Sequence, residues 1–283
     1  MQRLLNALTA HAVLRTPTRI EREFAGRGLS SLASHFGELP APAQAELRAR
    51  AEELHGHGVD VITFLDDEYP KQLLNNGRPV APILFIKGNA QLLHKPSIGM
   101  CGSRHATELG LKAAQACGEE AADNGVTVVS GYAAGVDTAT HLAALSRNGS
   151  TVIVLAEGID HFRVKKAYKG ALDPSRTLVV SQFAPWQRWA AHAAMTRNRI
   201  IYGLGRALVV IEAGERGGTL AAGAGALKIG RPVLVLNFGV DTPPGNAMLL
   251  AEGGAPVDSR QNFGKRLLEL ANQEGPRQET LEI

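Results

Sequence analysis

The chain has 283 residues, of which 45% are hydrophobic and 20% are charged, a composition that excludes an intrinsically disordered chain. Its formal net charge of +3 is too small to require an anionic partner, so the distribution of the charges along the chain is more informative. The two cysteines, Cys101 and Cys117, have neither metal-ligand nor redox spacing. That spacing excludes a disulfide framework and indicates a reducing cytoplasm.

Membrane insertion is not expected either. No apolar run approaches the roughly 18–20 residues that cross a bilayer. The first residues lack the apolar block and the small-residue cleavage site of a signal peptide. The sequence therefore predicts a cytoplasmic protein with no membrane partner.

The first elements in chain order are helical. Over residues 1–58, apolar and alanine positions recur at helical spacing between breakers such as Pro17 and Gly28. Two strands are predicted next, at 60–64 and 82–86, with a proline-bearing loop between them. These strands lead into a more regular part of the chain.

From residue 96 onward, short apolar runs alternate with helical stretches such as 107–124 and 137–148. Uniformly apolar strands that alternate with helices are typical of a parallel sheet buried on both faces. The predicted fold is therefore α/β: a Rossmann-like, doubly wound, mostly parallel sheet with a small helical N-terminal region. The predicted strands of this part are 97–101, 126–129, 151–155, 177–180, 207–211 and 232–236.

The expected domain organisation follows from these elements. Residues 1–58 form a helical N-terminal region, and residues 59–260 form the Rossmann domain. Within that domain, 59–95 carry the leading strands and 96–260 carry the core. Residues 261–283 are expected to form a C-terminal helix and a frayed polar tail.

The first strand of the core runs into a glycine-bearing turn, Gly102-Ser103-Arg104. Glycine lets the backbone approach an anion, and the helix that follows offers unpaired N–H donors at its positive end. Arg104 adds a bidentate phosphate partner. A plain turn with a solvated arginine explains the spacing equally well. The turn matches neither the dinucleotide-binding glycine motif nor a Walker A loop, so NAD and ATP lose their usual support.

Two further strand ends carry similar turns. One contains Gly131 and Gly135, and the other is Gly217-Gly218-Thr219. Because the carboxyl ends of neighbouring parallel strands meet at one edge of a sheet, three such turns would line one anion-binding crevice.

Asp137 and His141 lie one helical turn apart after the second of these strands. They suit an acid–base couple, but no nucleophile or metal cluster accompanies them. We therefore favour a structural interpretation, in which Asp137 caps the helix and His141 is a hydrogen-bonding group on its face. Neither a catalytic residue nor a metal site is predicted.

The segment 161–206 has nine basic residues against one acid, Asp173. Aromatic residues are interleaved with the basic ones. Single-stranded nucleic acid needs both, since phosphates pair with cations and bases stack on rings. Solvated helix faces and buried tryptophan anchors are the alternative explanation. The basic residues are Arg163, Lys165, Lys166, Lys169, Arg176, Arg188, Arg197, Arg199 and Arg206, and the aromatic ones are Phe162, Tyr168, Phe183, Trp186 and Trp189.

Short motifs in a fixed order over about residues 60–257 resemble the DprA/Smf (DNA-processing protein A) family. The chain departs from the family pattern at His161–Lys166, at Ser181-Gln182 and at Gly217-Gly218-Thr219. Too few residues follow Val257 for the family's C-terminal winged helix. The motifs are Tyr69-Pro70, Leu84-Phe85, Lys87-Gly88-Asn89, Gly102-Ser103-Arg104, Ser130–Asp137, Gly158-Ile159-Asp160, Arg197-Asn198-Arg199, Gly217–Leu220 and Gly245-Asn246.

The resemblance implies a Rossmann-like core that binds single-stranded DNA without strict sequence preference, needs no cofactor and performs no catalysis. It also implies a homodimer that assists loading of the RecA recombinase in transformation or recombination. Arg104 would be the central phosphate ligand, and Lys165 or Lys166 the DNA-contacting lysine. Ser103, Gly102 and the turn from Gly131 to Gly135 would offer backbone donors. The rest of the implied pocket is Arg197, Asn198, Arg199, Gly217, Gly218 and Thr219.

An enzyme is the main alternative. Nucleotide-hydrolysing enzymes of the lysine-decarboxylase-like Rossmann group resemble this chain at the Gly217-Gly218-Thr219 turn, but they carry a glutamate where Ala222 stands here. Without that carboxylate, general acid catalysis has no agent in the turn. A sensor of small nucleotides that signals to a partner is a weaker alternative.

Overall fold

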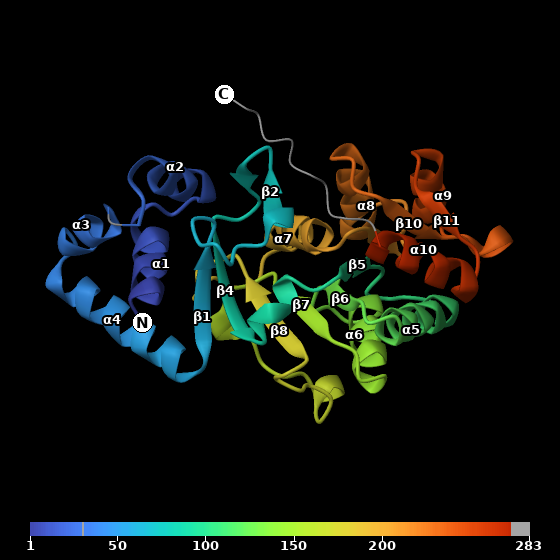
Figure 1. The fold of residues 1–283 in the computed structure, drawn as a ribbon, viewed down its shortest axis with the longest axis horizontal. Coiled ribbons are helices and arrows are strands. Elements are labelled where there is room, and N and C mark those ends of the chain that lie inside the picture. The colour runs from blue at the N-terminus through green and yellow to red at the C-terminus, as the bar shows by residue number, and fades with distance from the viewer. Residues whose placement is uncertain (30, 273–283) are drawn as a thin grey trace.

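The computed structural model describes residues 1–29 and 31–272. Across these residues nine strands form one sheet, in the order β1-β4-β8-β7-β6-β5-β9-β10-β11 (Figure 1). The seven strands from β8 to β11 are parallel, whereas β4 runs antiparallel to both β1 and β8. The strands are β1 (Val59–Thr63), β4 (Ile83–Gly88), β5 (Ser97–Cys101), β6 (Thr127–Ser130), β7 (Thr151–Val154), β8 (Thr177–Ser181), β9 (Leu208–Val210), β10 (Val233–Leu236) and β11 (Ala255–Val257).

The order of the strands reverses beside β5. From β5 the chain moves outward through α5 (Glu108–Asp123) to β6 and through α6 (Val136–Ser146) to β7. After β8, helix α7 (Ala191–Leu204) returns the chain to β9, on the other side of β5. In doubly wound sheets, ligands bind beyond the carboxyl ends of the strands at such a reversal. The predicted Rossmann-like, doubly wound and mostly parallel sheet is confirmed.

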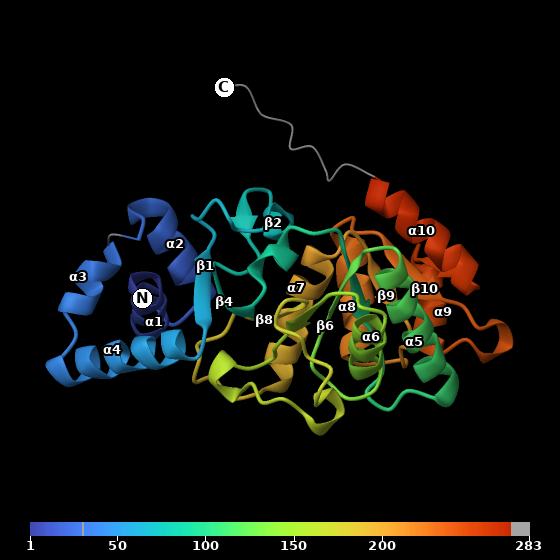
Figure 2. The ribbon, with the colours of Figure 1, turned by 60° about the horizontal axis from the view of Figure 1, so that its bottom comes forward.

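Three apolar clusters hold the helices against the sheet. Helices α5, α6 and α10 (Arg260–Asn272) cover one face over β5, β6 and β9. The N-terminal helices cover the same face at the other end of the sheet, over β1 and β4, and both views place them at that end (Figures 1 and 2). Helix α7 lies on the opposite face with α8 (Gly218–Lys228) and α9 (Pro244–Ala251). The N-terminal helices are α1 (Gln2–Val13), α2 (Pro17–Arg27), α3 (Ser31–Gly37) and α4 (Ala41–Gly56).

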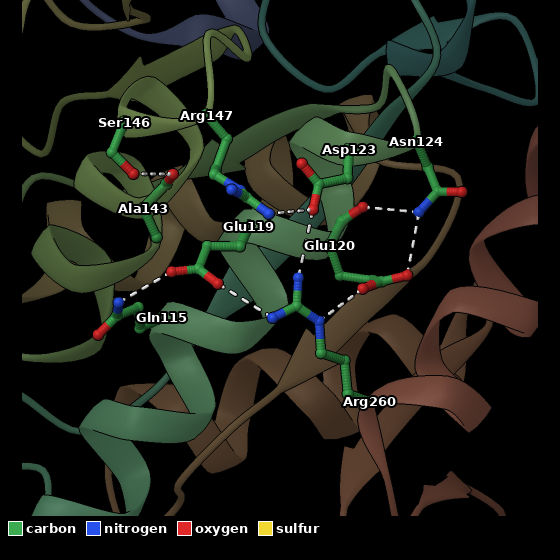
Figure 3. A network of polar contacts seen from close by, with 9 residues as sticks. All are labelled: Gln115, Glu119, Glu120, Asp123, Asn124, Ala143, Ser146, Arg147 and Arg260. Carbon is green, nitrogen blue, oxygen red and sulfur yellow. Dashed lines mark hydrogen bonds and ion pairs between the residues drawn. The ribbon is translucent and has the colours of Figure 1, made fainter.

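Helix α10 is fixed to α5 by a polar network and by packing (Figure 3). The Arg260 guanidinium donates to Glu120 at 2.7 Å and to Glu119 at 3.0 Å. These side chains are 20–43% exposed and lie near the surface, so the ion pairs contribute little stability. Phe263 and Leu267, each 1% exposed, bury the apolar side of the helix and contribute more.

The elements differ from the predicted ones mainly at their ends. The predicted helix 107–124 is α5, which runs from Glu108 to Asp123, and the predicted helix 137–148 is α6, which runs from Val136 to Ser146. Strand β11 was not predicted, because its residues Ala-Pro-Val form no apolar run and become a strand only by pairing with β10. The expected C-terminal helix is α10. The expected polar tail falls on 273–283, outside the described residues.

A two-stranded hairpin, β2 (Leu74–Asn75) and β3 (Arg78–Pro79), interrupts the segment between β1 and β4. Among the residues described, no helix is both long enough and apolar enough to cross a membrane.

Candidate nucleic-acid interface

The three glycine-rich turns lie side by side. They follow β6, β5 and β9, which are neighbours in the sheet. Gly135 has φ +72°, and a Cβ added there would lie 2.3 Å from the Ser103 carbonyl oxygen. The Val136 N–H donates to the same oxygen at 3.1 Å. The turns after β5 and β6 therefore pack backbone against backbone, which requires glycine at position 135.

A cavity of about 460 Å³ opens over the β5–β9 reversal, and a second of about 420 Å³ adjoins it over β6 and β7. Four residues line both: Arg104, Ala133, Trp189 and Arg197. We call the two cavities together the strand-end groove. The first is also lined by Gly102, Ser103, Asp137, Asn198, Arg216, Gly218 and Thr219, and the second by Tyr132, Glu157 and Lys165.

Arg104 and Trp189 form a ridge between the two cavities. The Arg104 guanidinium carbon lies 5.5 Å from the centroid of the Trp189 ring, which is a cation–π contact. Trp189 is 51% exposed and Trp186 is 39% exposed, so the alternative of two buried tryptophan anchors is wrong. An exposed ring under a guanidinium offers a face for stacking and a charge for phosphate in one place.

The floor of the groove is a buried ion pair. Arg197 and Asp137 lie 3.5 Å apart, with side chains 8% and 7% exposed. A Cβ on Gly131 would lie 1.9 Å from an Arg197 nitrogen, so glycine at that position makes room for the guanidinium. The Arg197 Nε is buried without a hydrogen-bond partner in the described residues. Arg197 thus keeps a free donor while its charge is compensated.

Asp137 does not cap helix α6, contrary to the sequence-based interpretation. The N-cap is Gly135, and Asp137 lies in the first turn of the helix. Its carboxylate accepts from the Ser130 hydroxyl at 3.1 Å and from the Ala133 N–H at 3.2 Å. Asp137 therefore holds the turn after β6 in shape and pairs with Arg197.

His141 is fully buried behind the same turn. Its Nε2 lies 2.7 Å from the Gly131 carbonyl oxygen, and its Nδ1 contacts the Thr151 hydroxyl. Burial lowers the pKa of His141 to about 4, so the ring is neutral at pH 7. In the part of the chain that the structure describes, no hydrogen bond joins it to Asp137. This geometry fits a structural role better than an acid–base couple.

The two candidate lysines differ in position. Lys165 lines the groove, and its Nζ lies 4.1 Å from the centroid of the Tyr132 ring and donates to the Tyr132 carbonyl oxygen. Partial burial lowers the pKa of Lys165. Lys166 is exposed and is not part of the groove lining.

Other members of the basic, aromatic segment also lie away from the groove. Arg199 is exposed on α7 outside the lining. Arg176 and Arg206 precede β8 and β9, at the amino ends of the strands, and Arg206 donates to the Leu270 carbonyl oxygen at 2.6 Å. Tyr168 is 0% exposed and belongs to the apolar core, so it offers no stacking face. The charge count thus predicted the kind of surface and overestimated how many residues form it.

Sequence reasoning also missed residues at the site. Arg216 lines the groove from inside the third glycine turn, where its place in the turn was the available signal. Glu212 follows β9 and accepts from both the N–H and the hydroxyl of Thr107, the hydroxyl at 2.7 Å. A Cβ on Gly110 would lie 2.1 Å from a Glu212 carboxylate oxygen. Glu212 thereby ties the end of β9 to the start of α5.

The site offers little reactive chemistry. Among the described residues no group of His, Cys, Asp or Glu side chains could hold a metal ion. Cys101 lines the groove, but burial raises the pKa of its thiol well above the usual range. A neutral thiol is a poor nucleophile.

The chain matches the family model of DNA recombination-mediator protein A over residues 60–267. It belongs to that family. DNA processing protein DprA of Streptococcus pneumoniae is 36% identical over 206 residues, covering 71% of this chain and 72% of the relative. Protein Smf of Escherichia coli is 35% identical over 204 residues, covering 70% of this chain and 54% of the relative. The resemblance to the DprA/Smf family is confirmed.

Solved structures agree with this assignment. The crystal structure of S. pneumoniae DprA has a TM-score of 0.68 at 28% identity and covers 92% of this chain and 91% of its own. A structure of Helicobacter pylori DNA processing protein A, which concerns its single-stranded DNA binding mode, has a TM-score of 0.64 at 22% identity, covering 75% and 96%. The second likeness bears on the fold alone.

Proposed function

We propose that the chain binds single-stranded DNA in the strand-end groove and does not catalyse a reaction. The observation that carries this proposal is the exposed Arg104–Trp189 ridge above the buried Arg197, at the strand reversal of the sheet. Cations neutralise phosphates, and an exposed ring stacks with a base of any sequence. The H. pylori relative, with the same fold, has a single-stranded DNA binding mode.

The roles of the groove residues differ. Arg104 and Lys165 are the phosphate ligands, and Trp189 is the stacking face. Arg197 lies below them as a buried charge that is paired with Asp137. Ser103, Gly102 and the Gly131–Gly135 turn shape the backbone beside the phosphates. Asn198, whose side-chain amide donates to the Gly218 carbonyl oxygen at 3.2 Å, holds the turn Gly217-Gly218-Thr219 in place at the far wall.

Three features of the site support a non-catalytic function. Ala222, rather than a carboxylate, lies on α8 behind the third glycine turn. The Cys101 thiol is neutral, and both ring nitrogens of His141 are already in contact with protein atoms. Neither the thiol nor the imidazole is therefore free to act in nucleophilic or general acid–base catalysis.

Family membership supports a proposal about the biological setting. We propose a cytoplasmic protein that forms a homodimer, protects single-stranded DNA and assists loading of the RecA recombinase during recombination or transformation. Residues 59–260 would act as the DNA-binding unit, with 1–58 and 261–283 attached to it. Co-purification with RecA on DNA and light scattering of the free protein test these partners directly.

The decisive experiment is a fluorescence-anisotropy titration of an oligothymidylate at several salt concentrations. We expect micromolar or tighter binding that weakens steeply with salt, because phosphate contacts release counterions. Arg199→Ala, on the same helix as Arg197 and outside the groove, is the control that leaves binding unchanged. Absence of binding at low salt would refute the proposal. Release of adenine from AMP would favour the hydrolase instead.

A further inference from the structure

Apart from the strand-end groove, another basic cavity, of about 440 Å³, lies where the N-terminal helices meet the sheet. Its walls come from α4, from β1 and β4, and from the segment after β7. We call it the α4 cavity. We infer that it receives the sugar-phosphate backbone of single-stranded DNA that leaves the strand-end groove, an inference that rests on the function proposed above. Its lining includes Arg50, His57, Lys87, Asp160, Phe162 and Arg163.

One short segment lines both the groove and the α4 cavity. Phe162 and Arg163 face the α4 cavity, while Lys165, only two residues later, faces the groove. Tyr132 joins the two sides: its ring centroid is 5.4 Å from that of Phe162, and its hydroxyl donates to the Arg163 carbonyl oxygen at 3.2 Å. The same hydroxyl accepts from the Lys165 N–H at 3.0 Å. A strand that passes over Lys165 is therefore led directly onto Arg163.

The charges of the α4 cavity suit a phosphate. Lys87 is half-buried on β4, and within the described residues its ammonium has neither a hydrogen bond nor an ion pair. Among the described residues, the Arg163 guanidinium donates only to backbone carbonyls, those of Asp160 at 2.7 Å and Phe162 at 2.8 Å. A phosphate bound in the cavity would give the Lys87 ammonium a counter-ion. The lining has two carboxylates, those of Asp160 and Glu53. Asp160 is already paired with Arg50, so Glu53 is the one carboxylate of the lining that would oppose a phosphate.

Trp186 adds a stacking face beside the cavity. The ring is 39% exposed, and the Arg50 guanidinium carbon lies 5.9 Å from its centroid. Arg50 comes from α4, so its contacts with Trp186 and Asp160 join the N-terminal helices to the loops at the strand ends. This arrangement repeats the Arg104–Trp189 ridge of the groove. A small anion would use the cations alone, whereas a strand also uses the ring and the continuous path.

The two tryptophans provide separate reporters, because the chain has no others. Trp189→Phe leaves Trp186 beside the α4 cavity, and Trp186→Phe leaves Trp189 in the groove. We would titrate each variant with oligothymidylates of about 6 and about 20 nucleotides, lengths below and above typical single-site sizes. Trp189 fluorescence should change with both lengths. Trp186 fluorescence should change only with the longer one.

Lys87→Gln tests the cation directly. It should weaken binding of the longer oligonucleotide and reduce its salt slope by about one, while binding of the shorter one stays as in the wild type. Lys95→Gln is the matched control, an exposed lysine just before β5 that is not part of the α4 cavity lining.

The outcomes separate this inference from the proposed function. One outcome overturns the inference alone. The wild type binds both oligonucleotides, Lys87→Gln changes the affinity for neither, and Trp186 fluorescence changes with neither. The α4 cavity is then not on the path of the DNA. Equal weakening of both lengths by Lys87→Gln would also overturn it. If the wild type binds neither, the proposed function fails first and the inference fails with it.

Discussion

The floor and the rim of the strand-end groove are built in opposite ways. The floor is buried: Arg197 and Asp137 are paired next to Gly131, and His141 lies behind the same turn. The rim is exposed: Arg104 and Trp189 face solvent and form a cation–π contact with each other. A buried charge pair fixes the shape of the site and is costly to disturb. An exposed ridge costs little to change and leaves its groups free for a ligand. Floor substitutions should therefore change stability, and rim substitutions should change DNA binding.

The largest expected effect is on the floor. Asp137→Ala leaves the Arg197 guanidinium buried without its partner and should lower the free energy of unfolding by about 3–5 kcal/mol. Urea denaturation measures the change. The control is Asp241→Ala, an exposed carboxylate on the surface, which should change stability by no more than about 0.5 kcal/mol. A loss at Asp137 as small as that of the control would show that the pair does not hold the floor together.

The pH dependence of stability is the next test of the floor. The folded-state pKa of His141 is about 4, below the ordinary histidine value of 6.5. As pH falls below 6.5, His141 binds a proton in the unfolded chain but not in the folded chain. Stability therefore decreases between pH 6.5 and pH 4. At pH 5, His141 should account for a decrease of about 2 kcal/mol in the free energy of unfolding.

Denaturation midpoints at pH 7 and pH 5 give this share as the difference between wild type and His141→Asn. His105→Gln, an exposed histidine between β5 and α5, should keep the wild-type difference between the two pH values. His11 also has its pKa lowered to about 4 by burial, so part of the dependence persists in His141→Asn. An unchanged difference in His141→Asn would contradict the expectation.

The rim should respond in binding and not in stability. Arg104→Ala removes a charge-assisted phosphate contact and should weaken oligothymidylate binding by about 1.5–3 kcal/mol, at an unchanged melting temperature. Anisotropy and thermal denaturation on the same preparation separate the two effects. Lys112→Ala, an exposed cation paired with Glu108 on α5, should bind as the wild type does. A large drop in melting temperature for Arg104→Ala would place Arg104 with the floor.

The smallest expected effect distinguishes two neighbouring lysines. Lys165→Ala should weaken binding by about 1 kcal/mol, since one exposed phosphate contact is lost. Lys166→Ala should leave the affinity unchanged, because Lys166 lies outside the groove lining. Anisotropy at low salt resolves this difference. Equal losses at both positions would mean that general surface charge, and not the groove, determines affinity.

Much of the fold was predictable from local sequence. The strands of the core are apolar runs because both faces of the sheet are covered, and the glycine turns follow them at the expected places. Strand β11 was not predictable, since its three residues pair with β10 only after α9 has folded back. Boundaries such as the start of α7 at Ala191 depend on packing that the sequence pattern does not encode.

The sequence predicted the type of surface at the site but only some of the residues that form it. The sequence indicated a basic, aromatic surface, and the structure brings Arg104, Lys165, Arg197 and Trp189 to one groove. It also puts Tyr168 in the core. Arg104 and Trp189 meet although a large part of the chain separates them, a contact that no spacing rule predicts.

By itself, the sequence determined the doubly wound sheet, its glycine turns and the family, because hydrophobic periodicity and turn chemistry act over a few neighbouring residues. Only the tertiary structure decided which cations face the groove. Arg206 precedes a strand and Arg216 follows it, so the same strand carries them to opposite edges of the sheet. Arg197 is buried over Gly131 by the return of α7 across the sheet. The charge of a side chain is fixed by the residue type. The direction in which the side chain points and its exposure to solvent are fixed by the crossovers that place its helix.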